Sequence, residues 1–271
     1  MLKDRRLAVL GAGKLGETLI QGLLEAGAID RSRVTVTTAH GPRLELVRER
    51  LGVAGTLSNA EAVQDADIVL LAVKPQQVPL VMSEIGGVLR PSQLLISVAA
   101  SVSAAFIEKH LREPVPVVRA MPNTPCLIRV GMTGIAMGKH ARQEHLEIAR
   151  RIFEAVGRTV IADEKHMDAI TALSASGPAY IYIIIESLAE AGVKVGLPRD
   201  MATELAAQTV VGAGEMVLRT GEHPAKLKDM VTTPAGCTID GILELEDGGL
   251  RVTLIKAVVC ATRRARELLE S

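Results

Sequence analysis

A glycine-rich turn between a short strand and a helix is the feature that most constrains the fold of this chain. Residues 7–10 are typical of a buried parallel strand, Gly11-Ala-Gly-Lys-Leu-Gly16 follows, and residues 17–26 have the pattern of an amphipathic helix. In this strand–turn–helix setting the G-x-G-x-x-G spacing predicts a dinucleotide-binding turn, with an ordinary βα turn as the alternative. We expect Gly11 to form the tight turn, Gly13 to admit a pyrophosphate, and Gly16 to let helix and strand pack closely. Free N–H groups at the helix N-terminus would bind the phosphates.

The composition indicates a globular chain that does not bind nucleic acid. Of the 271 residues, 48% are hydrophobic and 23% are charged, and the formal net charge is zero. A neutral chain gives no electrostatic reason to expect nucleic acid or an anionic membrane as partner. We also expect no membrane span, because the longest apolar run, residues 179–188, is short and contains Glu186.

The cysteines and histidines indicate neither disulfides nor a metal site. Cys126, Cys237 and Cys260 are odd in number and far apart, which favours reduced thiols and a cytoplasmic setting. His140 and His145 have no third ligand at a suitable spacing, so we expect no metal.

The pattern of elements predicts two domains. Residues 1–163 alternate strands with helices, which is typical of an α/β domain with a doubly wound, Rossmann-type parallel sheet. Residues 164–271 read as all-helical. The strands are expected near residues 34–37, 53–57, 68–73, 94–97, 117–121 and 134–137, and the later helices near 168–173, 178–191, 198–218, 224–230, 238–246 and 250–269. Residues 180–185 are apolar on every side of a helix, so we expect packing against a second subunit; a compact monomeric bundle is the alternative.

The end of the second strand favours NADPH as the cofactor. NAD-binding domains place a carboxylate there, whereas this chain has Thr38, His40 and Arg43, which suit a 2′-phosphate. Arg43 is an equally good candidate for a solvated residue on the following helix. Asn59 either reaches the adenosine ribose or caps a helix.

Further candidate residues follow the next two strands. Ala72-Val-Lys-Pro75 lies at the carboxyl end of a buried strand, where open sheets bind ligands, although a lysine at a surface turn is common. Ala100 leaves room for a nicotinamide ring.

Two loops in the second half are candidates for substrate binding. Residues 231–238 form a Pro- and Gly-containing loop whose N–H groups suit a small carboxylate, and Thr238 adds a hydroxyl. Residues 174–178 (Ser-Ala-Ser-Gly-Pro) have the same character. The alternative for both is a turn that begins a helix.

Together these motifs resemble those of pyrroline-5-carboxylate reductases, the last enzymes of proline biosynthesis. The resemblance covers essentially the whole chain, and the later motifs are more specific than the glycine turn. Met230, Ala235 and Ala175 stand where the family often has Asn, Gly and Gly. The motifs are residues 11–16, 72–75, Arg119-Ala-Met-Pro-Asn-Thr-Pro125, 173–180 and 227–238.

The resemblance implies hydride transfer from NAD(P)H to the C=N bond of 1-pyrroline-5-carboxylate, giving L-proline. It also implies a helical domain that interlocks in a homodimer, often assembled into a pentamer of dimers, a homodecamer. Ser176 and Gly177 would line the pocket; Gly236, Cys237 and Thr238 would hold the substrate. We assign Thr238 to hydrogen-bond or protonate the ring nitrogen, because a protonated imine needs placement more than a strong acid. The implied cofactor contacts are Gly11, Ala12, Gly13, Lys14, Leu15, Gly16, Thr38, Asn59, Ala72, Val73, Lys74, Pro75 and Ala100.

Two other functions fit the dinucleotide turn. A β-hydroxyacid dehydrogenase would use a lysine acid/base on the first long helix after the cofactor domain, but no lysine lies between Lys165 and Lys194. A non-catalytic NADP(H) sensor would bind NADPH without consuming it and would not need an intact loop at residues 234–238.

Overall fold

The computed structural model describes residues 2–267, which form two compact units. The first comprises the residues up to Ser176 together with the segment from Ala261 onward, and the second comprises Gly177–Cys260. The domain boundary expected after Asp163 stays a prediction.

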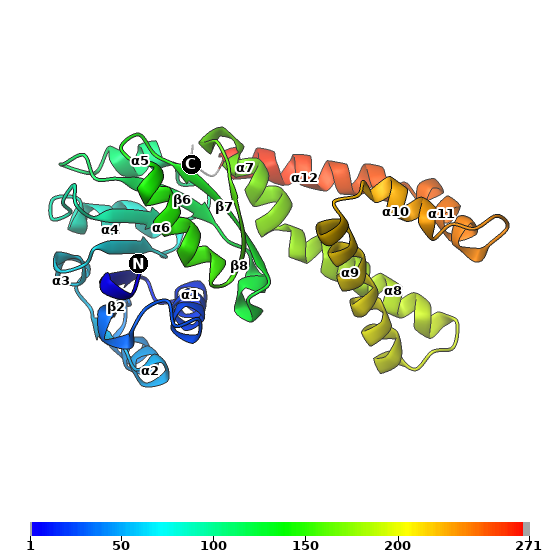
Figure 1. Cartoon of the computed structure of the whole chain (residues 1–271), viewed down its shortest axis with the longest axis horizontal. Coiled ribbons are helices and arrows are strands. Elements are labelled where there is room, and N and C mark those ends of the chain that lie inside the picture. The colour runs from blue at the N-terminus through cyan, green and yellow to red at the C-terminus, as the bar shows by residue number, and fades with distance from the viewer. Residues whose placement is uncertain (1, 268–271) are drawn as a thin grey trace. The chain divides into compact units, whose positions relative to one another are not determined.

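The first unit contains one eight-stranded sheet with the strand order β3-β2-β1-β4-β5-β6-β7-β8 (Figure 1). The first six strands are parallel to one another, which confirms the doubly wound architecture. The strands are β1 (Leu7–Leu10), β2 (Val34–Thr37), β3 (Ala54–Thr56), β4 (Ile68–Leu71), β5 (Leu94–Ser97), β6 (Val117–Met121), β7 (Gly131–Met137) and β8 (Gly157–Ile161).

The last two strands differ from the sequence prediction. β7 pairs antiparallel with β6, begins three residues earlier than expected, and pairs parallel with β8, which the sequence pattern missed. β8 lies at the sheet edge with Val160 and Ile161 partly exposed, so it lacks the buried apolar run that marked the other strands. The reversal puts the amino end of β7 at the edge where β1–β6 have their carboxyl ends.

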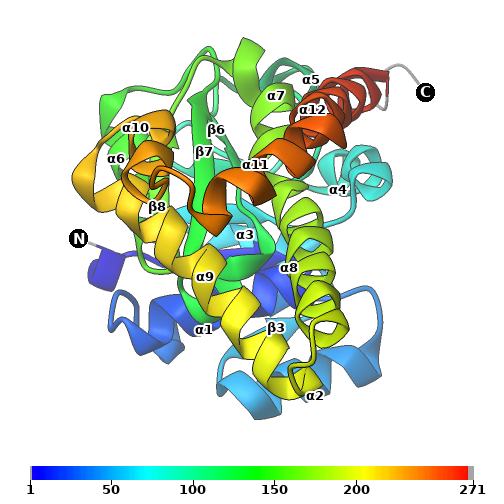
Figure 2. The ribbon, with the colours of Figure 1, turned by 90° about the vertical axis from the view of Figure 1, so that its right-hand side faces the viewer.

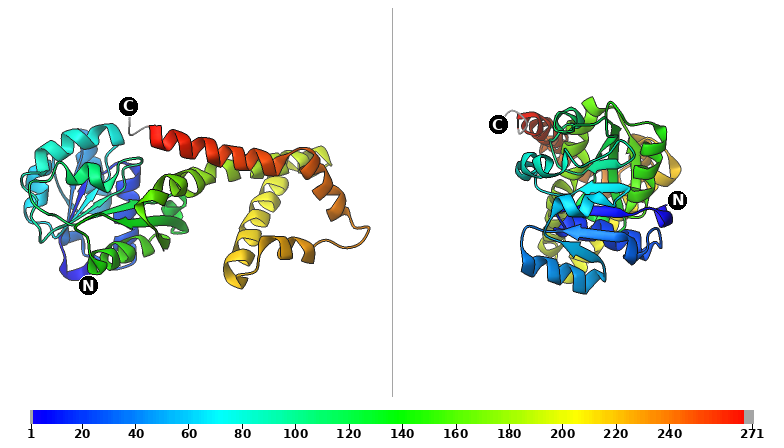
Figure 3. Two further views of the ribbon diagram at one scale, coloured as in Figure 1. Left: turned by 90° about the horizontal axis from the view of Figure 1, so that it is seen from above. Right: turned by 90° about the vertical axis from the view of Figure 1, so that its left-hand side faces the viewer.

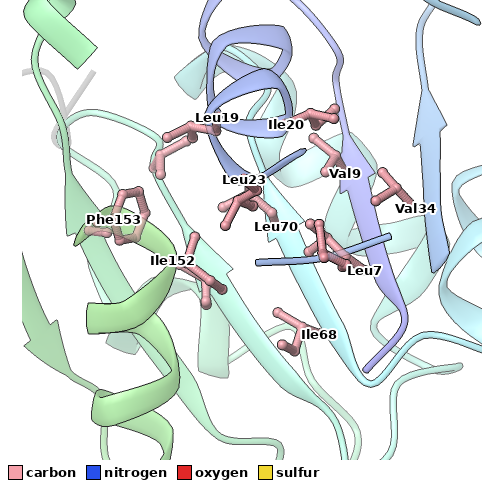
Figure 4. Close-up of a cluster of buried hydrophobic side chains, with 14 of the residues drawn as sticks. Leu7, Val9, Leu19, Ile20, Leu23, Val34, Ile68, Leu70, Ile152 and Phe153 are labelled. Atoms are coloured by element: carbon pink, nitrogen blue, oxygen red, sulfur yellow. The ribbon is translucent and has the colours of Figure 1, made fainter. Parts of the chain in front are cut away.

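Helices cover both faces of this sheet (Figure 3, left). One face packs on α1, α2 and α6; Leu23 lies beside Leu70 and Val9, and Phe153 beside Ile152 belongs to the same cluster (Figure 4). The other face packs on α3, α4 and α5. The helices of this unit are α1 (Lys14–Glu25), α2 (Gly41–Leu51), α3 (Asn59–Gln64), α4 (Val78–Ile85), α5 (Ala104–Glu108), α6 (Gln143–Glu154) and α7 (Met167–Ile170).

The second unit is all-helical, as expected, and α8 packs on α9 (Figure 2). Its hydrophobic side chains are poorly covered by their own unit. Among its described hydrophobic residues only Ala189, Ala202 and Ala206 are buried, whereas Tyr182 and Ile183 are 60% and 62% exposed. The helices are α8 (Gly177–Lys194), α9 (Arg199–Thr220), α10 (Pro224–Met230), α11 (Cys237–Asp247) and α12 (Leu250–Glu267), the last of which crosses into the first unit.

One continuous helical stretch, Glu164–Lys194, is long and apolar enough to cross a membrane by length and composition alone. The stretch is interrupted by charged residues, among them Glu186, so the expectation that the chain has no membrane span stays a prediction. A helix that packs on a second copy of the chain passes the same test, so the finding is weak evidence for a membrane.

Candidate active site

The glycine turn has the geometry that its sequence predicts. Gly11 has a φ of +86°, and a Cβ atom there would lie 2.6 Å from Val73 Cγ1. A Cβ on Gly16 would lie 2.9 Å from the Gly11 carbonyl oxygen, so the close helix–strand approach needs glycine. A Cβ on Gly13 would meet no atom within 4 Å. Gly13 therefore faces open space, as an approaching pyrophosphate requires.

The helix after this turn begins earlier than predicted. α1 starts at Lys14 instead of Glu17, with Gly13 as its N-cap residue in an extended conformation. Lys14, Leu15 and Gly16 therefore form its first turn, where backbone N–H groups have no partner within the helix. Those free donors and the positive end of the helix dipole suit a phosphate.

A groove of about 450 Å³ lies at the carboxyl ends of β1, β2 and β4. It brings together eight of the predicted cofactor residues: Gly11, Ala12, Gly13, Thr38, Asn59, Ala72, Val73 and Lys74. The other five predicted residues, Lys14, Leu15, Gly16, Pro75 and Ala100, do not line it. The groove also includes residues that the sequence analysis did not select, namely Thr37, Ala39, Leu57, Gln77, Leu80, Val81 and Glu84.

Asn59 belongs to the groove and does not cap α3. The N-cap residue is Ser58, whose Oγ accepts from Glu61 N at 3.2 Å, so the capping alternative for Asn59 was wrong. Asn59 Oδ1 instead accepts from Thr37 Oγ1 at 2.6 Å, and its Nδ2 donates to Glu84 Oε2 at 2.8 Å. These two hydrogen bonds fix the Asn59 amide beside the end of β2.

Arg43 also lines the groove and is held in place. Its Nε and Nη2 donate to the Ala12 carbonyl oxygen at 3.2 and 3.1 Å, and it forms an ion pair with Glu17. These contacts exclude the interpretation of Arg43 as a freely solvated residue. Thr38, whose Oγ1 donates to the His40 carbonyl oxygen at 2.9 Å, lies on the same wall. The open space at Gly13, the helix start and these polar groups fit a dinucleotide.

Ala100 lies apart from the groove lining, in a small apolar cluster. It packs with Ile170 and Ala175 against the buried side chains of Met121, Ala136 and Met167. The loop after β5 is thus in contact with the segment that leads to Ser176.

Residues 164–168, which come before that segment, are held by a buried arginine on β6. Arg119 is 2% exposed, and its guanidinium lies 3.7 Å from Glu164 Oε1 and 3.5 Å from Asp168 Oδ1. Glu164 Oε1 also accepts from Ala104 N at 2.6 Å. A buried guanidinium between two carboxylates fixes the start of α7 against the sheet.

Cys126, which follows the same motif, is not a candidate nucleophile. Burial raises the pKa of its thiol above the ordinary range, so the unreactive protonated form persists at neutral pH. Cys237 and Cys260 are exposed and free, and residues 2–267 contain no group of three or more His, Cys, Asp or Glu side chains suited to a metal ion.

Four of the predicted substrate residues lie in the second unit. Gly236 is the N-cap residue of α11, so the helix begins at Cys237, one residue before the prediction. Cys237 is exposed, and Thr238 is half-buried in the first turn. Ala235, just before them, has a φ of +56°, in the region that favours the glycine common in the family. Gly177 begins α8, and Ser176 directly before it is the last residue of the first unit's N-terminal segment.

Known protein families and individual known proteins match nearly all of this chain. Residues 164–268 match the pyrroline-5-carboxylate reductase dimerisation family, and residues 6–101 match the family described as NADP oxidoreductase, coenzyme F420-dependent. The chain is 42% identical to pyrroline-5-carboxylate reductase from Methanosarcina acetivorans, over 98% of this chain and 99% of the relative.

Solved structures of similar proteins have the same fold. A pyrroline-5-carboxylate reductase from Coxiella burnetii is 38% identical, with a TM-score of 0.91 over 97% of this chain and 98% of that one. The NADP-bound pyrroline carboxylate reductase from Plasmodium falciparum is 30% identical, with a TM-score of 0.89 over 99% and 100% of the two chains.

Proposed function

The chain belongs to the pyrroline-5-carboxylate reductase family, and on this premise we propose that it reduces 1-pyrroline-5-carboxylate to L-proline, the final step of proline biosynthesis. The observation that carries the proposal is the groove at the glycine turn, which fits a dinucleotide. The match to a reductase over 98% of this chain supports the same reaction. A bound nicotinamide would supply the hydride to the ring carbon of the C=N bond, and the ring nitrogen would end with the proton.

We propose that the groove residues and the first turn of α1 hold the cofactor. The space at Gly13 would admit the pyrophosphate, and the N–H groups of Lys14, Leu15 and Gly16 would bind it. Pro75 would shape the loop after β4, and Ala100 would leave space for the nicotinamide ring.

NADPH is the proposed cofactor in preference to NADH. Support comes from the wall after β2, where Thr38 and Arg43 line the groove and where no carboxylate follows the strand directly. An NADH-specific site needs a carboxylate there for the ribose hydroxyls, whereas a guanidinium suits a 2′-phosphate.

Thr238 is the residue proposed to act on the substrate. Its hydroxyl would donate to or accept from the ring nitrogen, and it makes no hydrogen bond to another group among residues 2–267. The free N–H group of Cys237 begins α11 and would bind the substrate carboxylate. Gly236 would lie beside that carboxylate as the N-cap residue, with its own N–H donating to the Thr233 carbonyl oxygen at 3.1 Å. Ser176 and Gly177 would line the pocket.

The test is the loss of NADPH absorbance in the presence of pyrroline-5-carboxylate, run in parallel with NADH. We expect rapid oxidation that depends on the substrate, faster with NADPH. Thr238→Ala should lower turnover strongly, whereas Thr238→Ser, which keeps the hydroxyl, should retain most of it. NADPH binding without oxidation would refute the reductase and favour a sensor.

We also propose a homodimer formed through the second unit. The exposed apolar side chains of α8 and α9 support it, as does the match to a dimerisation family. We further propose a homodecamer, which the family resemblance implies, and a cytoplasmic location, which the free cysteines support. Light scattering distinguishes a dimer from a decamer.

A further inference from the structure

The motif at residues 119–125 has no part in the proposed chemistry, yet Asn123 joins three segments of the first unit. Asn123 follows β6, and its Oδ1 accepts from Met132 N, in β7, at 2.9 Å. Its Nδ2 donates to the Ser174 carbonyl oxygen at 3.2 Å. One side-chain amide therefore ties the end of β6 to the start of β7 and to the segment that leads to Ser176.

The segment at the far end of this bond is a π-turn. Thr171–Ala175 forms a π-helix between α7 and α8, and Ser176 N donates to the Thr171 carbonyl oxygen at 2.9 Å. A π-turn is rare and is frequently found at functional sites, and a contact from outside the helix helps to hold its register. The Asn123 amide is such a contact.

The π-turn also lies against the loop proposed to face the nicotinamide. Ala175 and Ile170 share a cluster with Ala100. A change in the register of the π-turn would therefore move Ser174–Ser176 relative to Ala100. When a substrate is displaced by about 1 Å from the geometry in which it reacts, the enzyme loses much of the rate acceleration that comes from correct orientation.

We infer that Asn123 is a positioning residue for the reductase site. Its Nδ2–H donor fixes the π-turn so that residues 174–176 form the pocket wall beside the ring of the substrate. The inference rests on the proposed function, because it assigns a consequence for substrate binding and turnover. Asn123 acts through the π-turn and requires no contact with the substrate.

Asn123→Asp removes the donor to Ser174 while keeping the acceptor for Met132. We expect kcat/KM for pyrroline-5-carboxylate to fall by about tenfold, the ratio that corresponds to about one buried hydrogen bond. Amide hydrogen exchange over residues 171–176 should become faster. The affinity for 2′-phospho-ADP-ribose, which lacks the nicotinamide, should not change. Asn123→Ala, which removes both bonds, should show the same pattern if the aspartate variant folds poorly.

Gln93 supplies the matched control. Its Nε2 donates to the carbonyl oxygens of Val63 and Ala66 at 2.7 Å each, and it precedes β5, at the opposite end of the strand from Ala100. Gln93→Glu removes a buried amide donor in the same way. We expect it to lower the Tm and to leave kcat, KM and exchange over residues 171–176 unchanged.

Wild-type kcat and KM in both Asn123 variants, with a lowered Tm as in the Gln93 control, would overturn the inference. If the wild-type protein does not oxidise NADPH with this substrate, the proposed function fails. The exchange measurement then decides alone: unchanged exchange over residues 171–176 in Asn123→Asp refutes the positioning role.

Discussion

Gly13→Ala should separate cofactor binding from stability. The added methyl meets no protein atom within 4 Å, and the φ of −78° at this N-cap position is open to alanine. Alanine lowers the entropy of the unfolded chain, which stabilises by about 0.4–1 kcal/mol, but it is a poorer N-cap than glycine by a similar amount. The free energy of unfolding should therefore change by less than about 1 kcal/mol.

The same methyl would occupy the space that a pyrophosphate needs. Forcing one extra carbon into a fitted contact costs about 1–3 kcal/mol, so the Kd for NADPH should rise by about 5–150-fold. Gly11→Ala is the contrasting variant. Its positive φ costs about 1–2 kcal/mol and its overlap with Val73 about 1–3 more, so it should lose about 2–5 kcal/mol of stability.

Isothermal titration with NADPH and urea unfolding of the free protein measure the two quantities separately. The expected result for Gly13→Ala is weak binding by a protein of nearly wild-type stability. A wild-type Kd would refute the assignment of this turn to the pyrophosphate. A loss of several kcal/mol would show that the space at Gly13 is filled in the folded protein.

Three further predictions test other parts of the structure. Arg119→Met should lower the free energy of unfolding by about 3 kcal/mol, measured in urea, because two carboxylates lose their buried partner. Burial lowers the pKa of His145, whose Nδ1 accepts from Arg142 N. The unfolded chain therefore binds the proton more readily, and the free energy of unfolding should fall as the pH drops below about 6.5. His145→Asn should flatten that slope; an unchanged slope in urea titrations would contradict this explanation. Ile183→Glu, at a side chain 62% exposed, should yield monomers in sedimentation experiments while leaving NADPH binding intact.

The buried parts of the fold could be predicted from the sequence because their patterns are local. A continuous apolar run such as residues 68–71 between polar turns has few alternatives to a buried parallel strand. β8 could not be found in this way, because a half-exposed edge strand with Arg158 in it resembles a loop. Strand direction was also missed. Residues 122–130 alone join β6 to β7, which is too short for the crossover that parallel strands need, but the later start expected for β7, at residue 134, hid this.

The candidate site shows the same limit. Gly11, Gly13 and Gly16 could be selected because each position has a steric reason written in the motif. Asn59 could not be assigned, because a helix cap and a groove contact use the same residue type; only the Ser58 cap decides between them. The role of Asn123 depends on a bond to Ser174, 51 positions away, which no local pattern contains.

The thin apolar core of the second unit has a consequence for how the protein responds to dilution. Only three of its described hydrophobic residues, all alanines, are buried within the chain, so most of its hydrophobic stabilisation must come from a second copy. The folded state of such a unit obeys mass action, and each tenfold fall in chain concentration removes about 1.4 kcal/mol from the dimer. The melting temperature should therefore rise with protein concentration, and folding of this half should follow second-order kinetics.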